Sequence, residues 1–228
     1  MDFIFMLTRN DRTIDDAASL VDSACDLGVR HIGFKDVGVS FPTMRELVAN
    51  IRRRGGVCYL EVVSTTHEAM LRSLEAGRAL GVDRILGGTD LDAAMRVLGD
   101  LSRYFPFPGR PVGHPTLLEG SAALVAEHCR TARSMGCGGV DLLAYRATQA
   151  DPLDLVRAAR AAMPQGELIV AGSVNSSRRI NALAEAGVDA FTIGTAVFDG
   201  AFSPAKGSFR GQIQDILEAC DKAPKLAA

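Results

Sequence analysis

The stretch that decides the fold is "IVAGSVNSSRRINALAEAGVDAFTIGTAVF", residues 169–198. Two short apolar runs flank a segment with helical periodicity, so the stretch reads as a strand, a helix and a second strand. Each apolar run ends in a corner of small residues, Gly172-Ser173-Val174 and Gly194-Thr195-Ala196. Strands that alternate with helices predict a parallel sheet covered by helices.

The same pattern occurs four times along the chain. Residues 27–36, 80–90, 138–147 and 186–196 each carry a glycine, a valine and an Asp or Arg ahead of an apolar run. The glycines are Gly28, Gly81, Gly139 and Gly187. We expect each of them to end a helix in the left-handed conformation, and each apolar run to form a buried parallel strand.

Further apolar runs at 3–7, 57–63, 103–109 and 167–172 bring the expected strands to eight. Helical periodicity follows each strand, over 13–27, 43–54, 66–80, 91–104, 117–135, 152–163, 176–186 and 210–222. This alternation predicts a single α/β domain, a (β/α)8 TIM barrel over residues 1–222, with a frayed tail at 223–228.

Two features bear on that prediction. Pro106, Pro108, Pro111 and Pro115 crowd the fifth strand, so we expect it to be short and followed by a long loop. The alternative fold, a doubly wound open sheet, usually carries a GxGxxG turn after its first strand. Here "TRNDRT" stands in that place.

Composition narrows the function classes. The net charge of −2 and the absence of Trp disfavour nucleic acid as a partner, and no apolar run is long enough for a membrane span. The five cysteines are widely spaced without CxxC, as in a reducing compartment. The chain also lacks a signal-peptide pattern at its start. We expect a cytoplasmic protein; its oligomeric state is left open, a homo-oligomer included.

The two corners predict an anion site. Strands 7 and 8 of a barrel are neighbours, and their carboxyl ends carry the phosphate site of many such enzymes. Small residues expose backbone N–H groups, and a helix begins at Asn175 or Ser176. We therefore predict that a phosphate group binds at five residues: Gly172, Ser173, Val174, Gly194 and Thr195. The other interpretation is that small residues merely close tight turns.

Residues 168–198 resemble the last two units of the ribulose-phosphate-binding barrel superfamily. That group includes tryptophan- and histidine-pathway barrels, pentulose-phosphate epimerases and decarboxylases, and thiamine phosphate synthase. The resemblance implies phosphate held by the backbone at Gly172, Ser173, Gly194 and Thr195. It selects no reaction, because that fold hosts isomerases, epimerases, lyases and synthases. The DxKxxD motif of the decarboxylases is absent. The strand-1 cysteine of phosphoribosylanthranilate isomerase is also replaced, by Met6 or Leu7.

Lys35 and Glu61 are the leading candidates for chemistry. Lys35 ends the second strand and Glu61 lies inside the third, each among apolar residues. A buried carboxylate needs a partner, and neighbouring strands bring these two side chains together. Three interpretations stay open: a structural ion pair, an acid/base pair acting on an enolisable sugar phosphate, and a Schiff base formed by Lys35.

Other polar residues are sorted by the end of the barrel at which they lie. Asp90 and His114 are candidates for a second catalytic group, and Arg9, Tyr145 and Arg146 are candidates for substrate binding. Asp83, Asp141 and Asp189 share one place in the repeat, ahead of a strand. We therefore place those three aspartates at the opposite end, in structural roles.

The sequence predicts no metal site and no cofactor, because it holds no HxH or HExxH motif. A divalent ion held by Asp36, Glu61 and Asp90 is the one alternative considered. The leading hypothesis is an enzyme acting on a small phosphorylated sugar through enolate chemistry, as an isomerase, epimerase or carbon–carbon lyase. The rival hypotheses are a non-catalytic sugar-phosphate-binding regulatory barrel and a Schiff-base aldolase using Lys35.

Overall fold

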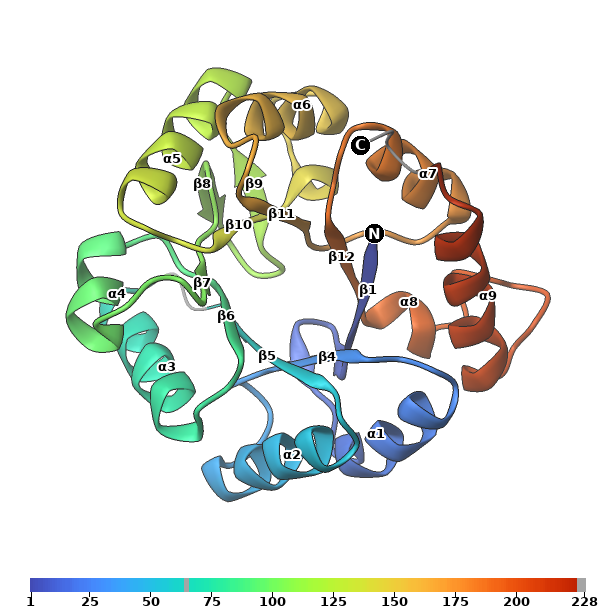
Figure 1. Cartoon of the computed structure of the whole chain (residues 1–228). Helices are drawn as coiled ribbons and strands as arrows, with labels where there is room; N and C mark the ends of the chain where they lie inside the picture. Colours follow the sequence, from blue (N-terminus) through green and yellow to red (C-terminus); the bar gives the residue numbers. More distant parts are fainter. Residues whose placement is uncertain (64–65, 225–228) are drawn as a thin grey trace.

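The computed structural model describes residues 1–63 and 66–224, in which eight parallel strands form a barrel ringed by helices (Figure 1). The hydrogen-bonded order is β10-β11-β12-β1-β4-β5-β6-β7. The bounds are β1 Asp2–Met6, β4 His31–Lys35, β5 Val57–Val62, β6 Arg84–Gly87, β7 Tyr104–Phe105, β10 Gly139–Leu142, β11 Glu167–Val170 and β12 Ala190–Ile193. The (β/α)8 prediction is confirmed.

Each predicted helix is present, most of them shorter than expected. The bounds are α1 Ala17–Asp26, α2 Phe41–Arg53, α3 His67–Leu80, α4 Leu91–Leu98, α5 Ala122–Ser134, α6 Pro152–Ala162, α7 Ser177–Glu185, α8 Thr195–Phe198 and α9 Phe209–Lys222. A Ser, Thr or Asp side chain caps most of these helices, and Ser176 caps α7 by accepting from the Arg179 N–H. The four-residue α8 was not predicted.

Alternation along the strands divides the apolar side chains into two layers. Phe3, Phe5 and Leu7 pack outward with the helices, whereas Ile4 and Met6 belong to a smaller cluster inside the barrel. The inner cluster continues with Tyr59, Leu86, Phe105, Ile169 and Ala190. Residues of the same parity higher on the strands therefore face the barrel mouth.

The barrel closes by few hydrogen bonds between β7 and β10. β7 has only two residues, as expected for the short fifth strand, and Pro106 and Pro108 that follow have no N–H to donate. The Asp141 N–H donates to the Pro106 carbonyl at 3.0 Å, and the Gly138 N–H donates to the Leu101 carbonyl at 3.1 Å. The proline-rich side of this seam acts as an acceptor.

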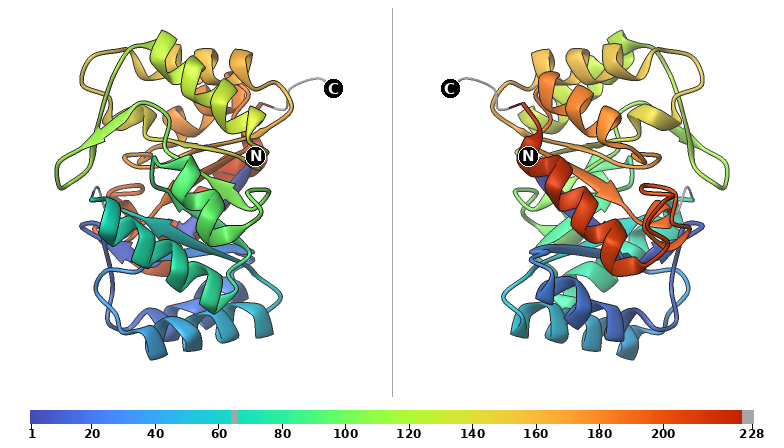
Figure 2. Two further views of the ribbon diagram at one scale, coloured as in Figure 1. Left: turned by 90° about the vertical axis from the view of Figure 1, so that its left-hand side faces the viewer. Right: turned by 90° about the vertical axis from the view of Figure 1, so that its right-hand side faces the viewer.

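Two small hairpins stand at the barrel mouth where a loop or a helix was expected. The strands β2 (Thr8–Arg9) and β3 (Arg12–Thr13) pair antiparallel, so α1 begins later than the predicted residue 13. The strands β8 (Arg110–Val112) and β9 (Leu117–Glu119) pair likewise, which corrects the predicted helix start at 117. Figure 2 places the β8–β9 hairpin and the N-terminus at opposite ends of the barrel.

In the third copy of the repeat, the predicted capping glycine is wrong by three residues. Gly28, Gly81 and Gly187 have positive φ as predicted, but Gly139 does not; Gly136, at φ 82°, has this role after α5. Gly139 is instead a strand residue where an added Cβ would lie 1.8 Å from the Glu167 carbonyl oxygen. The predicted position of Asp141 is therefore wrong: it lies inside β10 rather than ahead of it.

The other two repeat aspartates lie where they were predicted. Asp83 accepts from the Cys58 N–H at 2.8 Å and Asp189 from the Leu168 N–H at 2.7 Å, both at the amino ends of strands. Of the predicted tail, residues 225–228 lie outside the described residues. A membrane-crossing helix would have to be longer and more apolar than any found within 1–63 and 66–224.

Candidate active site

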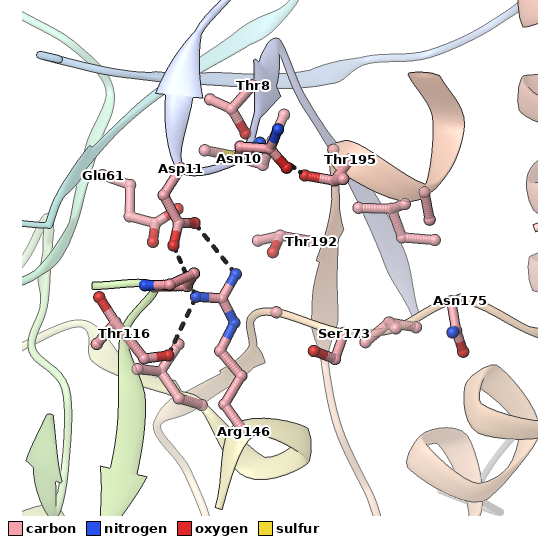
Figure 3. Close-up of a pocket in the computed structure, with 18 of the residues that line it drawn as sticks. Thr8, Asn10, Asp11, Glu61, Thr116, Arg146, Ser173, Asn175, Thr192 and Thr195 are labelled. Carbon is pink, nitrogen blue, oxygen red and sulfur yellow. Dashed lines mark hydrogen bonds and ion pairs between the residues drawn. The ribbon is translucent and has the colours of Figure 1, made fainter. Parts of the chain in front are cut away.

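A cavity of about 410 Å³ opens at the carboxyl ends of the strands (Figure 3). Its wall includes Lys35 of β4, Glu61 of β5 and Thr192 of β12. The corners after β11 and β12 complete it on one side, and Thr116 and Leu117 of the β8–β9 hairpin on another. The cavity thus joins the predicted phosphate corners to the predicted catalytic pair.

Lys35 stands between two carboxylates inside this cavity. Its Nζ lies 2.7 Å from Asp11 Oδ1 and 3.4 Å from Glu61 Oε1. All three residues are almost entirely buried, at 3% exposure for Lys35, 5% for Asp11 and 6% for Glu61. Lys35 and Glu61 face each other because they are register partners on adjacent strands. The predicted meeting of these two side chains is confirmed.

Asp11 reaches the cavity from the turn of the β2–β3 hairpin. Asn10 and Asp11 have φ of 51° and 59°, as a two-residue type I′ turn requires, and Asn and Asp tolerate that conformation best after Gly. The Asn10 N–H donates to Thr195 Oγ1 at 3.1 Å, which ties the turn to the corner after β12. The hairpin therefore holds a carboxylate over the end of β4.

Arg146 binds the Asp11 carboxylate from the side opposite Lys35. It ends the 3₁₀ helix η1 (Ala144–Arg146) that follows β10, and its two terminal nitrogens donate to Asp11 Oδ2 at 3.0 Å and Oδ1 at 3.1 Å. It also donates to the Thr116 carbonyl at 3.1 Å. Burial raises the pKa of Asp11, but hydrogen bonds from Arg146 and Lys35 outweigh it and hold that pKa well below its usual range.

The corner after β11 is shaped to leave backbone groups open. Gly172 and Ser173 have φ of 77° and 58°, and a Cβ at Gly172 would lie 2.3 Å from Arg146 Nε. Within the described chain, the N–H groups of Gly172, Ser173 and Val174 donate to no carbonyl or side chain. The guanidinium of Arg146 therefore lies directly against a turn with unpaired donors.

The corner after β12 is equally crowded. A Cβ at Gly194 would lie 2.6 Å from the Thr8 carbonyl oxygen, so only glycine fits there. Thr195 begins α8 beside it and faces Ser173 across the cavity in Figure 3. The two corners and Arg146 thus surround one end of the cavity, and Lys35 and Glu61 lie at the other.

Asp141 completes the charged group from inside the barrel. Its neighbours Val140 and Leu142 pack outward, so its carboxyl points inward, with no exposed surface. Neither of its oxygens has a hydrogen-bond partner among the described residues. Burial, with the nearby charge of Glu61, raises the pKa of Asp141 well above its usual range.

Four predicted site residues lie away from this cavity wall. Asp90 caps α4 and lies 3.1 Å from His67 Nδ1, and His114 is exposed in the β8–β9 turn. Arg9 does not line the cavity, but it pairs at 2.7 Å with Asp199, which does. Tyr145 stacks under Arg179, whose Cζ lies 4.5 Å from the ring centre.

The divalent-ion alternative finds no common site. Asp36 follows Lys35 but points outward, where Ser73 of α3 donates to it, and Asp90 serves as a helix cap. Burial raises the pKa of Asp36 despite that hydrogen bond. Across residues 1–63 and 66–224, no three His, Cys, Asp or Glu side chains gather as metal ligands would. Glu61 faces Lys35, and neither Asp36 nor Asp90 lies with it to form an ion site.

The sequence placed Asp11 at the end of the first strand but gave it no role, and it placed Asp141 at the wrong end of the barrel. Asp11 had a signal, because Asn-Asp between matching Thr-Arg and Arg-Thr pairs is a type I′ hairpin pattern. Asp141 also had one, since Gly136 follows the helix three residues ahead of the glycine chosen as the cap. Thr116 and Thr192 carried no signal beyond their places near strand ends.

No family model matches the chain, and no curated protein matches its sequence. Solved structures resemble its fold. Thiamine phosphate pyrophosphorylase from Pyrococcus furiosus has a TM-score of 0.62 at 13% identity, covering 96% of this chain and 95% of that one. Orotidine 5'-phosphate decarboxylase from Pyrococcus horikoshii OT3 has 0.64 at 14%, covering 97% and 100%. A chain of the tryptophan synthase complex from Pyrococcus furiosus has 0.63 at 16%, covering 96% and 97%. At these identities the likeness establishes the barrel fold.

Proposed function

We propose that this protein is an enzyme that binds a small sugar phosphate and interconverts or cleaves it through an enolate. The observation that carries the proposal is the Lys35–Glu61 pair, 3.4 Å apart inside the cavity that also contains both glycine corners. Two of the similar structures are, by name, enzymes of phosphate-containing compounds. The resemblance of residues 168–198 to phosphate-binding barrels points the same way.

The phosphate binds at the two corners in this proposal. It accepts hydrogen bonds from the open N–H groups of residues 172–174 and from the start of α8. Arg146 lies against Gly172, and Arg179, which donates to the Ser173 carbonyl, is a second cation at this corner. The sugar then extends toward Lys35 and Glu61 at the other end of the cavity.

Glu61 and Lys35 divide the chemistry between them. Glu61 removes a proton from the carbon next to the substrate carbonyl, and the Lys35 ammonium stabilises the enolate oxygen that forms. Return of the proton to the neighbouring carbon gives an isomer, and return from the other face gives an epimer. In a lyase the enolate forms instead by cleavage: Glu61 takes the proton of the β-hydroxyl, the bond between the α- and β-carbons breaks, an aldehyde leaves, and the enolate that remains is protonated at its α-carbon.

The contacts of Lys35 favour this role over a Schiff base. A nucleophilic amine must be uncharged, whereas Asp11 and Glu61 both lie within 3.4 Å of Nζ and stabilise the ammonium. Borohydride treatment with substrate separates the two. A covalent adduct on Lys35 would favour the aldolase, and an unmodified chain that still turns over would favour the enolate route.

Thermal unfolding against triose to hexose phosphates tests the anion site. Each phosphate is compared with its unphosphorylated sugar and with inorganic phosphate. A ligand at one hundred times its dissociation constant stabilises the folded state by about 2.7 kcal/mol. Stabilisation by phosphorylated members alone is expected; a chain indifferent to all of them would overturn the phosphate site.

Deuterium uptake tests the chemistry on whichever sugar phosphate stabilises the chain. Exchange of the substrate's α-hydrogen in D2O, followed by NMR, reports the enolate without knowledge of the product. Glu61→Gln is expected to slow exchange by about 10²- to 10⁴-fold while binding persists. Glu68→Gln, on an 87% exposed side chain, is the matched control. Binding without exchange in the wild type would support the regulatory-barrel alternative.

A further inference from the structure

Asp141 is a buried group that the proposed mechanism leaves without a task. Its carboxyl is fully buried, yet neither oxygen accepts or donates a hydrogen bond among the described residues. Its backbone N–H helps to close the barrel at Pro106, which any residue except proline would do as well. Packing at this inward position would therefore be served better by an apolar side chain.

Asp141 lies beside the apolar inner cluster, with Ile169 as its register partner on β11. The charges that act on its carboxyl are those of Glu61 from β5, Lys35 from β4 and Arg146 from η1. The two cations already have partners, since Lys35 and Arg146 both bind Asp11 and Lys35 also meets Glu61. With Asp11 and Glu61 as carboxylates, this group of four is neutral overall before Asp141 is counted.

An ionised Asp141 would upset that balance. It would place a third carboxylate beside two cations, without a hydrogen bond to offset the loss of water, which is among the costliest arrangements in a protein interior. It would also add a negative charge behind Glu61 and Lys35, beneath the cavity in which we propose that a phosphate binds. A neutral carboxylic acid avoids both penalties.

We infer that Asp141 is a positioning residue, a carboxylic acid that stays protonated behind the Asp11–Lys35–Glu61–Arg146 cluster and whose ionisation in alkaline solution weakens anion binding in the cavity. The protonated state rests on burial and missing partners alone. Its effect on anion binding rests on the function proposed above.

Carboxyl ¹³C NMR on aspartate-labelled protein tests the protonated state directly. One aspartate carboxyl is expected to remain protonated at pH 7, and its signal is expected to be missing from Asp141→Asn. Should that variant fail to fold, the wild-type titration alone decides. A wild type in which every aspartate carboxyl has ionised by pH 6 overturns the inference.

Sulfate binding tests the link to the cavity, because sulfate keeps its double charge across the pH range. The wild type is expected to bind sulfate at least threefold more weakly above the pH at which Asp141 ionises than below it. Asp141→Asn is expected to lose that step. An identical step in the variant overturns the link, and Asp154→Asn on the exposed start of α6 is the control.

The two proposals fail separately. A protonated Asp141 in a chain that binds neither sulfate nor sugar phosphate would contradict the phosphate site but leave the buried acid standing. Sulfate binding without a protonated aspartate would contradict the buried acid but leave the phosphate site standing. The pH profile of α-hydrogen exchange gives a further reading, since its alkaline decline should shift in Asp141→Asn and would not shift if Asp141 only filled space.

Discussion

Asp11 binds two cations at once, and most of the electrostatics of the site depends on it. Lys35 lies 2.7 Å from one of its oxygens, and Arg146 spans both. Removal of one member of a buried ion pair costs about 3–5 kcal/mol, because the remaining charge stays buried without a partner. In this site Arg146 would lose its carboxylate partner, and Lys35 would keep only Glu61, at 3.4 Å.

Asp11→Asn is therefore expected to destabilise the protein by about 3–5 kcal/mol at pH 7. The folded pKa of Asp11 is depressed, so its stabilisation is present above the unfolded value of about 3.9 and is lost as the pH falls toward the folded value. Denaturant unfolding should show that the difference in unfolding free energy between wild type and variant becomes smaller below about pH 4.

The control for this measurement is Asp154→Asn. Asp154 pairs with Arg157 at 3.0 Å, but both side chains are more than 60% exposed, at 65% and 63%. Exposed pairs contribute about 0–1 kcal/mol. If the difference in unfolding free energy between the wild type and Asp11→Asn stays constant down to pH 3, the stabilisation comes from the shape of the side chain and not from its charge.

The turn after β11 shows how an element shapes the site. Two features favour glycine at position 172: its φ is positive, and the Arg146 side chain lies where a Cβ would be. Gly200 has a similar φ of 67° but has no atom within 4 Å of an added Cβ. The two glycines therefore separate backbone strain from displacement of Arg146.

Gly172→Ala should lose both stability and phosphate binding, whereas Gly200→Ala should lose about 1 kcal/mol of stability and keep its binding. Isothermal titration with the stabilising sugar phosphate, or with inorganic phosphate, checks the pair. Equal affinities in the two variants would mean that the position of Arg146 does not matter to the anion.

Strands and helices were predictable because their signals are long. Period-3.6 segments, three of them followed by a capping glycine, located every major helix, and the order of neighbouring strands brought Lys35 and Glu61 together. The hairpins β2–β3 and β8–β9 were missed because two or three residues are too few to show a period. Asp141 was missed because Gly139 imitates a helix cap that Gly136 provides.

Over the whole molecule, the strands are joined unevenly. β4 and β5 share five register positions, whereas β6 and β7 share two, and β7 meets β10 by isolated bonds such as Asp141 N–H to Pro106. Local opening follows the weakest part of a structure. The barrel is expected to open first at this seam.

Native-state hydrogen exchange checks that expectation. The amides of Phe107 and Asp141 should exchange at least tenfold faster than those of Ile32 and Leu60 at the β4–β5 ladder. All four residues are buried, so burial alone predicts no such difference. Uniform protection around the ring would show that the helices outside, and not the ladder, set the stability of each strand.

The pairing of β1 with β12 has a consequence for how the chain is made. Asp2 lies beside Ala190, and the turn that carries Asp11 is hydrogen-bonded to Thr195. During synthesis, β1 therefore cannot pair with β12 until the end of the chain has been made. A ribosome adds about 5–20 residues per second, and the interval is therefore on the order of ten seconds or more. Throughout that time Phe3 and Phe5 lack the aromatic partners Phe191 and Phe198. The nascent chain must be kept from aggregating until its final unit emerges, and only then does the mouth of the barrel exist.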